Sequence, residues 1–234
     1  MDEQESDKLP QLGSRAPDRL AAALRAGSGM IPLVGSVIAE IVNELVPNQR
    51  ADRIEKYLLY LTQEVAKCKI ENVDRRLKKL ENVDLLETGA FQSARALSDE
   101  RLLYIAKAVA EGIAAEERDK INAKRILNLI GELDDEEILI LDAYGTHEGD
   151  KFAKLRPEPA YIGAKREVIE RAELYDAAKT KLQRLSLIGK KISLNSKTKT
   201  PEFDMFSGEP KGYMRITPLG SLVLRRIGLG EDDD

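Results

Sequence analysis

Hydrophobic positions recur with a helical period along the first 131 residues of this chain. A seam with spacings of four and three residues follows a cap at Asn48 and consists of Ile54, Leu58, Leu61, Val65 and Cys68. The same spacing resumes two residues out of step with Cys68, at Ile70, Val73, Leu77 and Leu80. One straight helix cannot keep both seams on one face, so the pattern predicts a break or bend within residues 69–72.

Capping residues predict where later helices begin and end. Ser98 precedes two acidic residues and an apolar stripe, which indicates a helix start, and Gly131 is a suitable stop for the last helix of this region. Asp134 can cap the first helix of a second region, and residues 145–159 then form a loop. The longest helix of that second region is expected over residues 165–188.

Strand-like segments occur only near the C-terminus. Residues 190–194 and 213–216 are the two candidates, and the 18 residues between them are far more than a tight hairpin needs. Thr217 and Pro218 fit the N-cap and first position of a last helix. The order helix, strand, strand, helix is typical of a winged-helix domain. The expected fold is mainly α, with an N-terminal helical bundle followed by a C-terminal winged-helix (α+β) domain.

Composition places these regions between polar ends. The 234-residue chain has a net charge of −4, a single cysteine and an acidic start unlike a signal peptide. An intramolecular disulfide is therefore excluded, and a cytoplasmic location is expected. The predicted organisation is a disordered tail over residues 1–14, a helical bundle over 15–131, a winged-helix domain over 132–230 and an acidic tail over 231–234.

A proline-bounded segment over residues 31–46 is amphipathic and unusually apolar. Its apolar stripe consists of Val34, Val37, Ile38, Ile41 and Leu45. As a helix, residues 33–46 would rise only ~21 Å, which is short of the ~30 Å hydrocarbon core of a bilayer. The segment cannot span a membrane alone. Burial inside the bundle is the preferred interpretation. The alternatives are membrane insertion after oligomerisation and a position in the membrane interface.

Positive charge gathers in one window of this acidic chain. Residues 177–201 hold seven Lys and Arg residues and no carboxylate, a pattern that suits phosphates or an acidic partner. The candidate contact residues are Lys181, Arg184, Lys190, Lys191, Lys197, Lys199 and Arg215. Four carboxylates between residues 167 and 176 would repel phosphates, so a solvated or partner-binding face is preferred over direct nucleic-acid binding. The aromatic cluster at residues 201–206 either docks back on its own domain or contacts another chain.

Few residues of this sequence are suited to catalysis or metal binding. His147 is the only histidine, and it lies far in sequence from Cys68, so a zinc site or a Cys–His pair lacks ligands and partners. Glycines at positions 27, 29 and 35 are not followed by the Lys-Ser/Thr of a phosphate-binding loop. We therefore expect no catalytic, metal-binding or cofactor-binding residues, no cofactor and no enzymatic activity.

Three short stretches carry a family resemblance: LNLIGELDDEEILIL at residues 127–141, LSLI at 185–188 and ITPLG at 216–220. Over about residues 100–227 the chain resembles the Abi-alpha family of bacterial abortive-infection proteins. The resemblance implies phage defence by a non-enzymatic, effector-like protein, and it transfers no catalytic residue.

The expected function combines this resemblance with the predicted architecture. The winged helix would sense or dock a protein partner encoded nearby, and the helical bundle would supply effector action or assembly as a homo-oligomer. The alternative is a DNA-binding transcriptional regulator that dimerises through its helical region.

Overall fold

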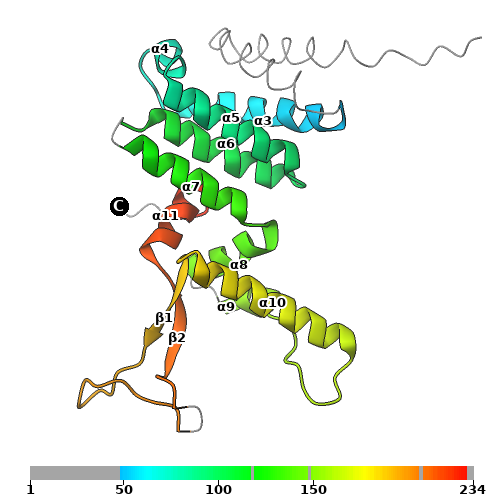
Figure 1. Ribbon diagram of the computed structural model, residues 1–234, viewed down its shortest axis with the longest axis vertical. Helices are drawn as coiled ribbons and strands as arrows, with labels where there is room; N and C mark the ends of the chain where they lie inside the picture. Colours follow the sequence, from blue (N-terminus) through cyan, green and yellow to red (C-terminus); the bar gives the residue numbers. More distant parts are fainter. Residues whose placement is uncertain (1–47, 117–118, 147–148, 206–207, 231–234) are drawn as a thin grey trace, which may run out of the picture. The chain divides into compact units, whose positions relative to one another are not determined.

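The computed structural model describes residues 48–116, 119–146, 149–205 and 208–230. Within these ranges the chain is mainly helical, with helices α3 to α11 and one two-stranded antiparallel sheet near the C-terminus (Figure 1). The predictions for the tail at residues 1–14, the acidic end at 231–234 and His147 lie outside the described residues. The same holds for the apolar stripe of Val34, Val37, Ile38, Ile41 and Leu45.

The chain divides into two compact units, Met1–Leu127 and Asn128–Asp234. The division lies within helix α7 (Lys120–Glu132), four residues before the boundary that the sequence suggested. Helix α7 also continues past Gly131, so that glycine does not end it as predicted. Each unit is described by itself below.

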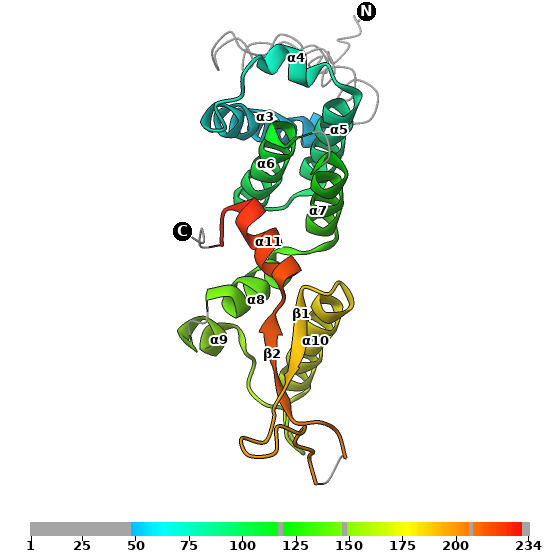
Figure 2. The same ribbon diagram turned by 90° about the vertical axis from the view of Figure 1, so that its left-hand side faces the viewer.

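The N-terminal unit is built on three long helices that lie side by side: α3 (Asn48–Lys67), α5 (Leu80–Arg95) and α6 (Asp99–Ala114) (Figures 1 and 2). The predicted start of α6 is confirmed, because the side chain of Ser98 accepts the backbone N–H of Arg101. The largest fully buried side chains of this unit are Ile54, Tyr57, Leu61, Leu85, Leu86, Leu102, Ile105, Ile113 and Leu127.

The predicted break after α3 is confirmed. Lys69 and Asn72 both have left-handed backbone angles, with φ values of 49° and 53°, and the short helix α4 (Val73–Leu77) begins directly afterwards. The continuation of the seam to Leu80 is wrong. Leu80 is 82% exposed because it begins α5 instead of extending the buried side of α4.

Two cations cover the carbonyl end of α6. The Lys120 ammonium, which is buried, donates to the carbonyl oxygens of Gly112 (2.6 Å) and Ile113 (2.8 Å). Arg76 Nη1 donates to the carbonyl of Ala114 at 2.6 Å. The last carbonyls of a helix have no intrahelical donors and carry partial negative charge, so both contacts stabilise this end of α6.

The C-terminal unit is centred on α8 (Asp135–Thr146), which packs against the other helices and the second strand. A capping box begins α8: Glu137 N–H donates to Asp134 Oδ1, and Asp134 N–H donates to Glu137 Oε2, both at 2.8 Å. The prediction of Asp134 as the cap is confirmed. The predicted loop over residues 145–159 is wrong, because it contains helix α9 (Gly149–Leu155), which is held to α8 by an edge-to-face contact between Phe152 and Tyr144.

The long helix α10 (Arg166–Arg184) ends four residues earlier than the sequence suggested. Ser186 adopts φ 60°, and the N–H of Leu187 returns to the carbonyl of Leu182 at 2.9 Å. This is a Schellman motif with serine at the left-handed position that glycine usually occupies. The reversal leads the chain directly into the sheet.

The sheet pairs β1 (Ile188–Ile192) with β2 (Gly212–Ile216), which overlap both predicted strands. Helix α11 (Pro218–Ile227) follows, with Pro218 in its first turn. The Thr217 hydroxyl accepts the N–H of Gly220 at 3.0 Å, which confirms the predicted N-cap. Figure 1 shows the two strands running side by side away from α10 toward the long connection between them.

Candidate functional site

The two faces of the β1–β2 ribbon differ in chemistry. In the observed register Ile188 lies opposite Ile216, and Lys191 lies opposite Tyr213. Because side chains alternate along a strand, one face carries Ile188 and Ile216 with the residues in phase with them. Ile188 is buried and Ile216 half-buried, so this apolar face turns toward the helices at that end, whereas Lys190 and Ile192 on the same face are exposed.

The opposite face of the ribbon, which we call the cationic face, consists of Gly189, Lys191, Tyr213 and Arg215. Lys191 and Arg215 are exposed, and the Tyr213 side chain is 55% exposed. Gly189 lies opposite Arg215 and has no side chain to cover the guanidinium. Two cations therefore flank an aromatic ring on an open, two-stranded surface.

Backbone hydrogen bonds organise the long connection into two turns. At its base three segments meet: Ser193 N–H donates to Lys211 O (2.8 Å), Glu202 N–H to Ser193 O (3.0 Å) and Lys211 N–H to Glu202 O (2.7 Å). From this junction one turn runs over residues 195–200 and the other over 204–209, and each is closed by its own backbone bonds. The connection is thus a defined structure, of which residues 206 and 207 lie outside the described part.

The two turns differ in composition. The first turn carries Lys197 and Lys199, both exposed, and Asn195 Oδ1 accepts the N–H groups of Lys197 (3.0 Å) and Thr198 (3.1 Å). The second turn and the residue before it expose apolar side chains, with Met205 94% and Phe203 55% exposed. Within the described residues, the aromatic cluster at 201–206 therefore leaves much of its apolar surface open to solvent.

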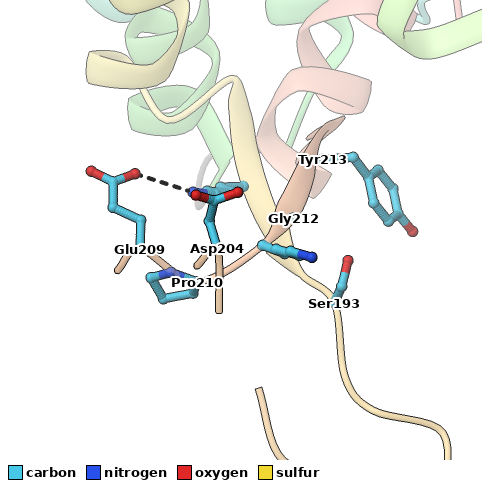
Figure 3. Close-up of a pocket in the computed structure, with 8 residues that line it drawn as sticks. Ser193, Asp204, Glu209, Pro210, Gly212 and Tyr213 are labelled. Atoms are coloured by element: carbon cyan, nitrogen blue, oxygen red, sulfur yellow. Dashed lines mark ion pairs between the residues drawn. The ribbon is translucent and has the colours of Figure 1, made fainter. Parts of the chain in front are cut away.

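An open pocket of about 520 Å³ lies beside the apolar face, at the base of the second turn. Lys190 Nζ lies 3.7 Å from Glu209 Oε2 in this pocket. Figure 3 shows Asp204 and Glu209 on one side of the strand pair and Tyr213 on the other. The pocket is lined by two lysines and two carboxylates, together with Ser193, Pro210, Gly212 and Tyr213. Its charges balance, so it offers no site for a strongly charged small molecule.

The structure separates the predicted contact residues into three groups. Lys181 makes an internal ion pair, since its ammonium lies 2.7 Å from Glu137 Oε2. Lys190 faces Glu209 in the pocket. The exposed remainder comprises Arg184 at the end of α10, Lys191 and Arg215 on the cationic face, and Lys197 and Lys199 on the first turn.

The exposed surface of α10 is not basic over its first three turns. Its carboxylates Glu167, Glu170, Glu173 and Asp176 are all exposed. Two of its cations are matched within the helix: Arg166 Nε lies 2.6 Å from Glu170, and Lys179 Nζ lies 3.1 Å from Asp176. The exposed cations Lys191 and Arg215 of the ribbon, and Lys197 and Lys199 of its connection, lie outside these turns.

Sequence reasoning missed Tyr213 as a member of the surface. It appeared only as part of a predicted strand, although the spacing of Tyr213 and Arg215 by two residues already places both on one face of that strand. Lys191 could not be added to the face from sequence alone, because this requires the register between strands.

The described residues give no support for a metal site or a membrane-spanning helix. In these ranges no group of three His, Cys, Asp or Glu residues is arranged to hold a metal ion. None of the described helices combines the length and apolarity needed to cross a bilayer. Comparison with models of protein families, with curated proteins and with solved structures finds no match to this chain. The cationic face and the adjoining connection are thus the candidate functional site.

Proposed function

We propose that this chain is a non-enzymatic bacterial defence protein of the abortive-infection type, whose C-terminal unit is a winged-helix module that docks a protein partner. The order α8, α9, α10, β1, β2 agrees with that of a winged helix, with residues 193–211 as the wing. The N-terminal helices would supply assembly or effector action. The family resemblance supports the defence role, and the surface of the C-terminal unit supports the docking role.

One observation carries the choice of a protein partner: the cationic face exposes Lys191 and Arg215 with no carboxylate on it, while the leading turns of α10 expose four carboxylates and only two arginines, Arg166 and Arg171. A winged helix that reads DNA commonly places this helix in the major groove, next to phosphates. Carboxylates at that position would repel the duplex. A partner that touches the ribbon and its connection avoids this repulsion.

A phage-plating assay tests the proposal. Bacteria that express the full chain should reduce the plating efficiency of at least one phage in a panel. The double variant Lys191→Glu, Arg215→Glu should lose this protection, because it reverses both charges of the cationic face. The matched control is Arg171→Glu on the exposed surface of α10, which should retain protection. A double variant that remains folded and fully protective contradicts the role of this face.

Binding of nucleic acid distinguishes the alternative regulator. The exposed Lys197 and Lys199 on the wing are where a DNA-binding winged helix would touch the backbone. In that case the full chain should bind duplex DNA, with a slope of log affinity against log salt of about −0.9 for each phosphate contact. Replacing both lysines with Gln should then flatten the slope. A salt-dependent complex of this kind would overturn docking of a protein as the main role of the ribbon.

A further inference from the structure

The register of the ribbon defines which backbone groups remain unpaired. Thr217 N–H donates to Leu187 O at 3.0 Å, and Ser193 N–H donates to Lys211 O at 2.8 Å. In an antiparallel pair such hydrogen-bonded positions alternate with positions whose N–H and C=O point outward. Gly212 and Met214 of β2, and Lys190 and Ile192 of β1, therefore direct their backbone groups away from the partner strand.

The outer edge of β2 is open at its wing end, where Gly212 is exposed. Helix α10 contacts β1, and α8 and α11 contact β2. Gln183 of α10 also donates to the sulfur of Met214 at 3.1 Å. Gly212 has no side chain to hinder an approaching backbone, and Met214 is only half-buried. Among the described residues no third strand covers this edge.

We infer that the outer edge of β2 at Gly212 and Met214 accepts an extended acidic segment of a partner protein, which adds a third strand to the ribbon. This inference rests on the proposed docking function and names the kind of partner. Strand addition supplies backbone hydrogen bonds for affinity, while alternate side chains supply specificity. An unpaired strand edge is a template for such pairing.

The charge of the cationic face and the two-residue period of a strand define which partner segment fits beside β2. A strand added beside β2 places every second side chain on the cationic face, next to Tyr213 and Arg215, with Lys191 one strand further away. Carboxylates at these positions lie next to Arg215 and across β2 from Lys191. The intervening side chains face Met214 on the other side, where apolar residues fit. The preferred partner segment therefore alternates acidic and apolar residues.

The test measures binding of a short fluorescein-labelled peptide, in which Glu and Val alternate, to the full chain by fluorescence anisotropy. The decisive variant is Met214→Pro, which removes an outward N–H that the ribbon itself does not use. The matched control is Ile192→Pro, which makes the same change on the edge of β1. We expect Met214→Pro to weaken binding at least about tenfold and Ile192→Pro to leave it within about twofold.

A second probe keeps the side chains and removes only backbone donors. The same peptide with alternate backbone nitrogens methylated should fail to bind the wild-type chain. Binding of the unmethylated peptide should slow hydrogen exchange of the Met214 amide. These two measurements decide the question even if Met214→Pro does not fold, which circular dichroism would show.

The outcomes separate the inference from the proposed function. Equal binding of the methylated peptide, or binding lost in Ile192→Pro and kept in Met214→Pro, overturns strand addition at β2. Failure of the unmethylated peptide to bind overturns the acidic, strand-adding partner. In each case the phage-plating assay still decides whether the cationic face has a defence role.

Discussion

Lys181 Nζ lies 2.7 Å from Oε2 of Glu137, the same oxygen that accepts the N–H of Asp134 in the capping box of α8. The Glu137 side chain is only 5% exposed, whereas that of Lys181 is 29% exposed. The pair connects the last turn of α10 to the first turn of α8. Lys181, which the sequence suggested as a contact for nucleic acid or a partner, thus has a partner inside its own unit.

Replacing Lys181 with Met should lower the free energy of unfolding by about 1–3 kcal/mol, since it leaves a nearly buried carboxylate without its charged donor. Urea denaturation of the full chain measures this change. The matched control is Lys179→Met. Its partner Asp176 is 68% exposed, so this ion pair should contribute less than about 0.5 kcal/mol. Equal changes in the free energy of unfolding would show that the Lys181–Glu137 pair contributes no more to stability than the Lys179–Asp176 pair.

A second prediction concerns Tyr57, whose hydroxyl is fully buried and has no hydrogen-bond partner among the described residues. A side chain on Gly89 would collide with this hydroxyl and come within 2.8 Å of Val109 Cγ2. Tyr57→Phe should therefore raise the free energy of unfolding by about 1 kcal/mol, because it removes an unpaired buried polar group. A thermal melt that shows clear destabilisation would mean that the hydroxyl has a partner in solution.

Alkaline pH gives a third prediction for the same residue. Burial raises the pKa of the Tyr57 phenol above its ordinary value of 10.0. Above about pH 10 the unfolded chain loses this proton while the folded chain keeps it, so deprotonation favours the unfolded chain and the free energy of unfolding falls as pH rises. Denaturation measured between about pH 9 and pH 11, on either side of the ordinary tyrosine pKa, gives the free energy of unfolding. This free energy should fall more steeply with pH for wild type than for Tyr57→Phe. Parallel curves would contradict this.

The fourth prediction concerns the carbonyl end of α6. Lys120→Met should lower the free energy of unfolding by about 1–3 kcal/mol, because the carbonyls of Gly112 and Ile113 lose a buried cationic donor. Lys107→Met, at a half-buried position within α6, is the control and should change stability much less. If the two variants unfold at the same urea concentration, the capping role of Lys120 is wrong.

Local sequence signals predicted several helix ends correctly. Ser98, Asp134 and Thr217 each act as caps in the structure, because a capping interaction spans only three residues and depends little on distant contacts. The break near residues 69–72 was also predictable, since two seams out of step cannot lie on one face of a helix. Such signals between residues close in sequence decide where helices begin and where they bend.

Other features depended on contacts between distant residues. Helix α9 is too short to show a full apolar period, and Phe152 packs on Tyr144 of α8. The end of α10 was missed because Ser186, rather than glycine, takes the left-handed position. Neither feature leaves a clear local signal in the sequence.

For the candidate site, the sequence by itself determined the basic composition of residues 177–201 and the spacing that puts Tyr213 and Arg215 on one face of a strand. The tertiary structure decided which of those cations are available. It pairs Lys181 with Glu137, turns Lys190 toward Glu209 and sets Lys191 opposite Tyr213. The 19-residue connection over residues 193–211 does not by its length specify strand register, and a shift of one residue would move every side chain to the other face. The backbone junction at Ser193, Glu202 and Lys211 specifies that register, and with it the cationic face.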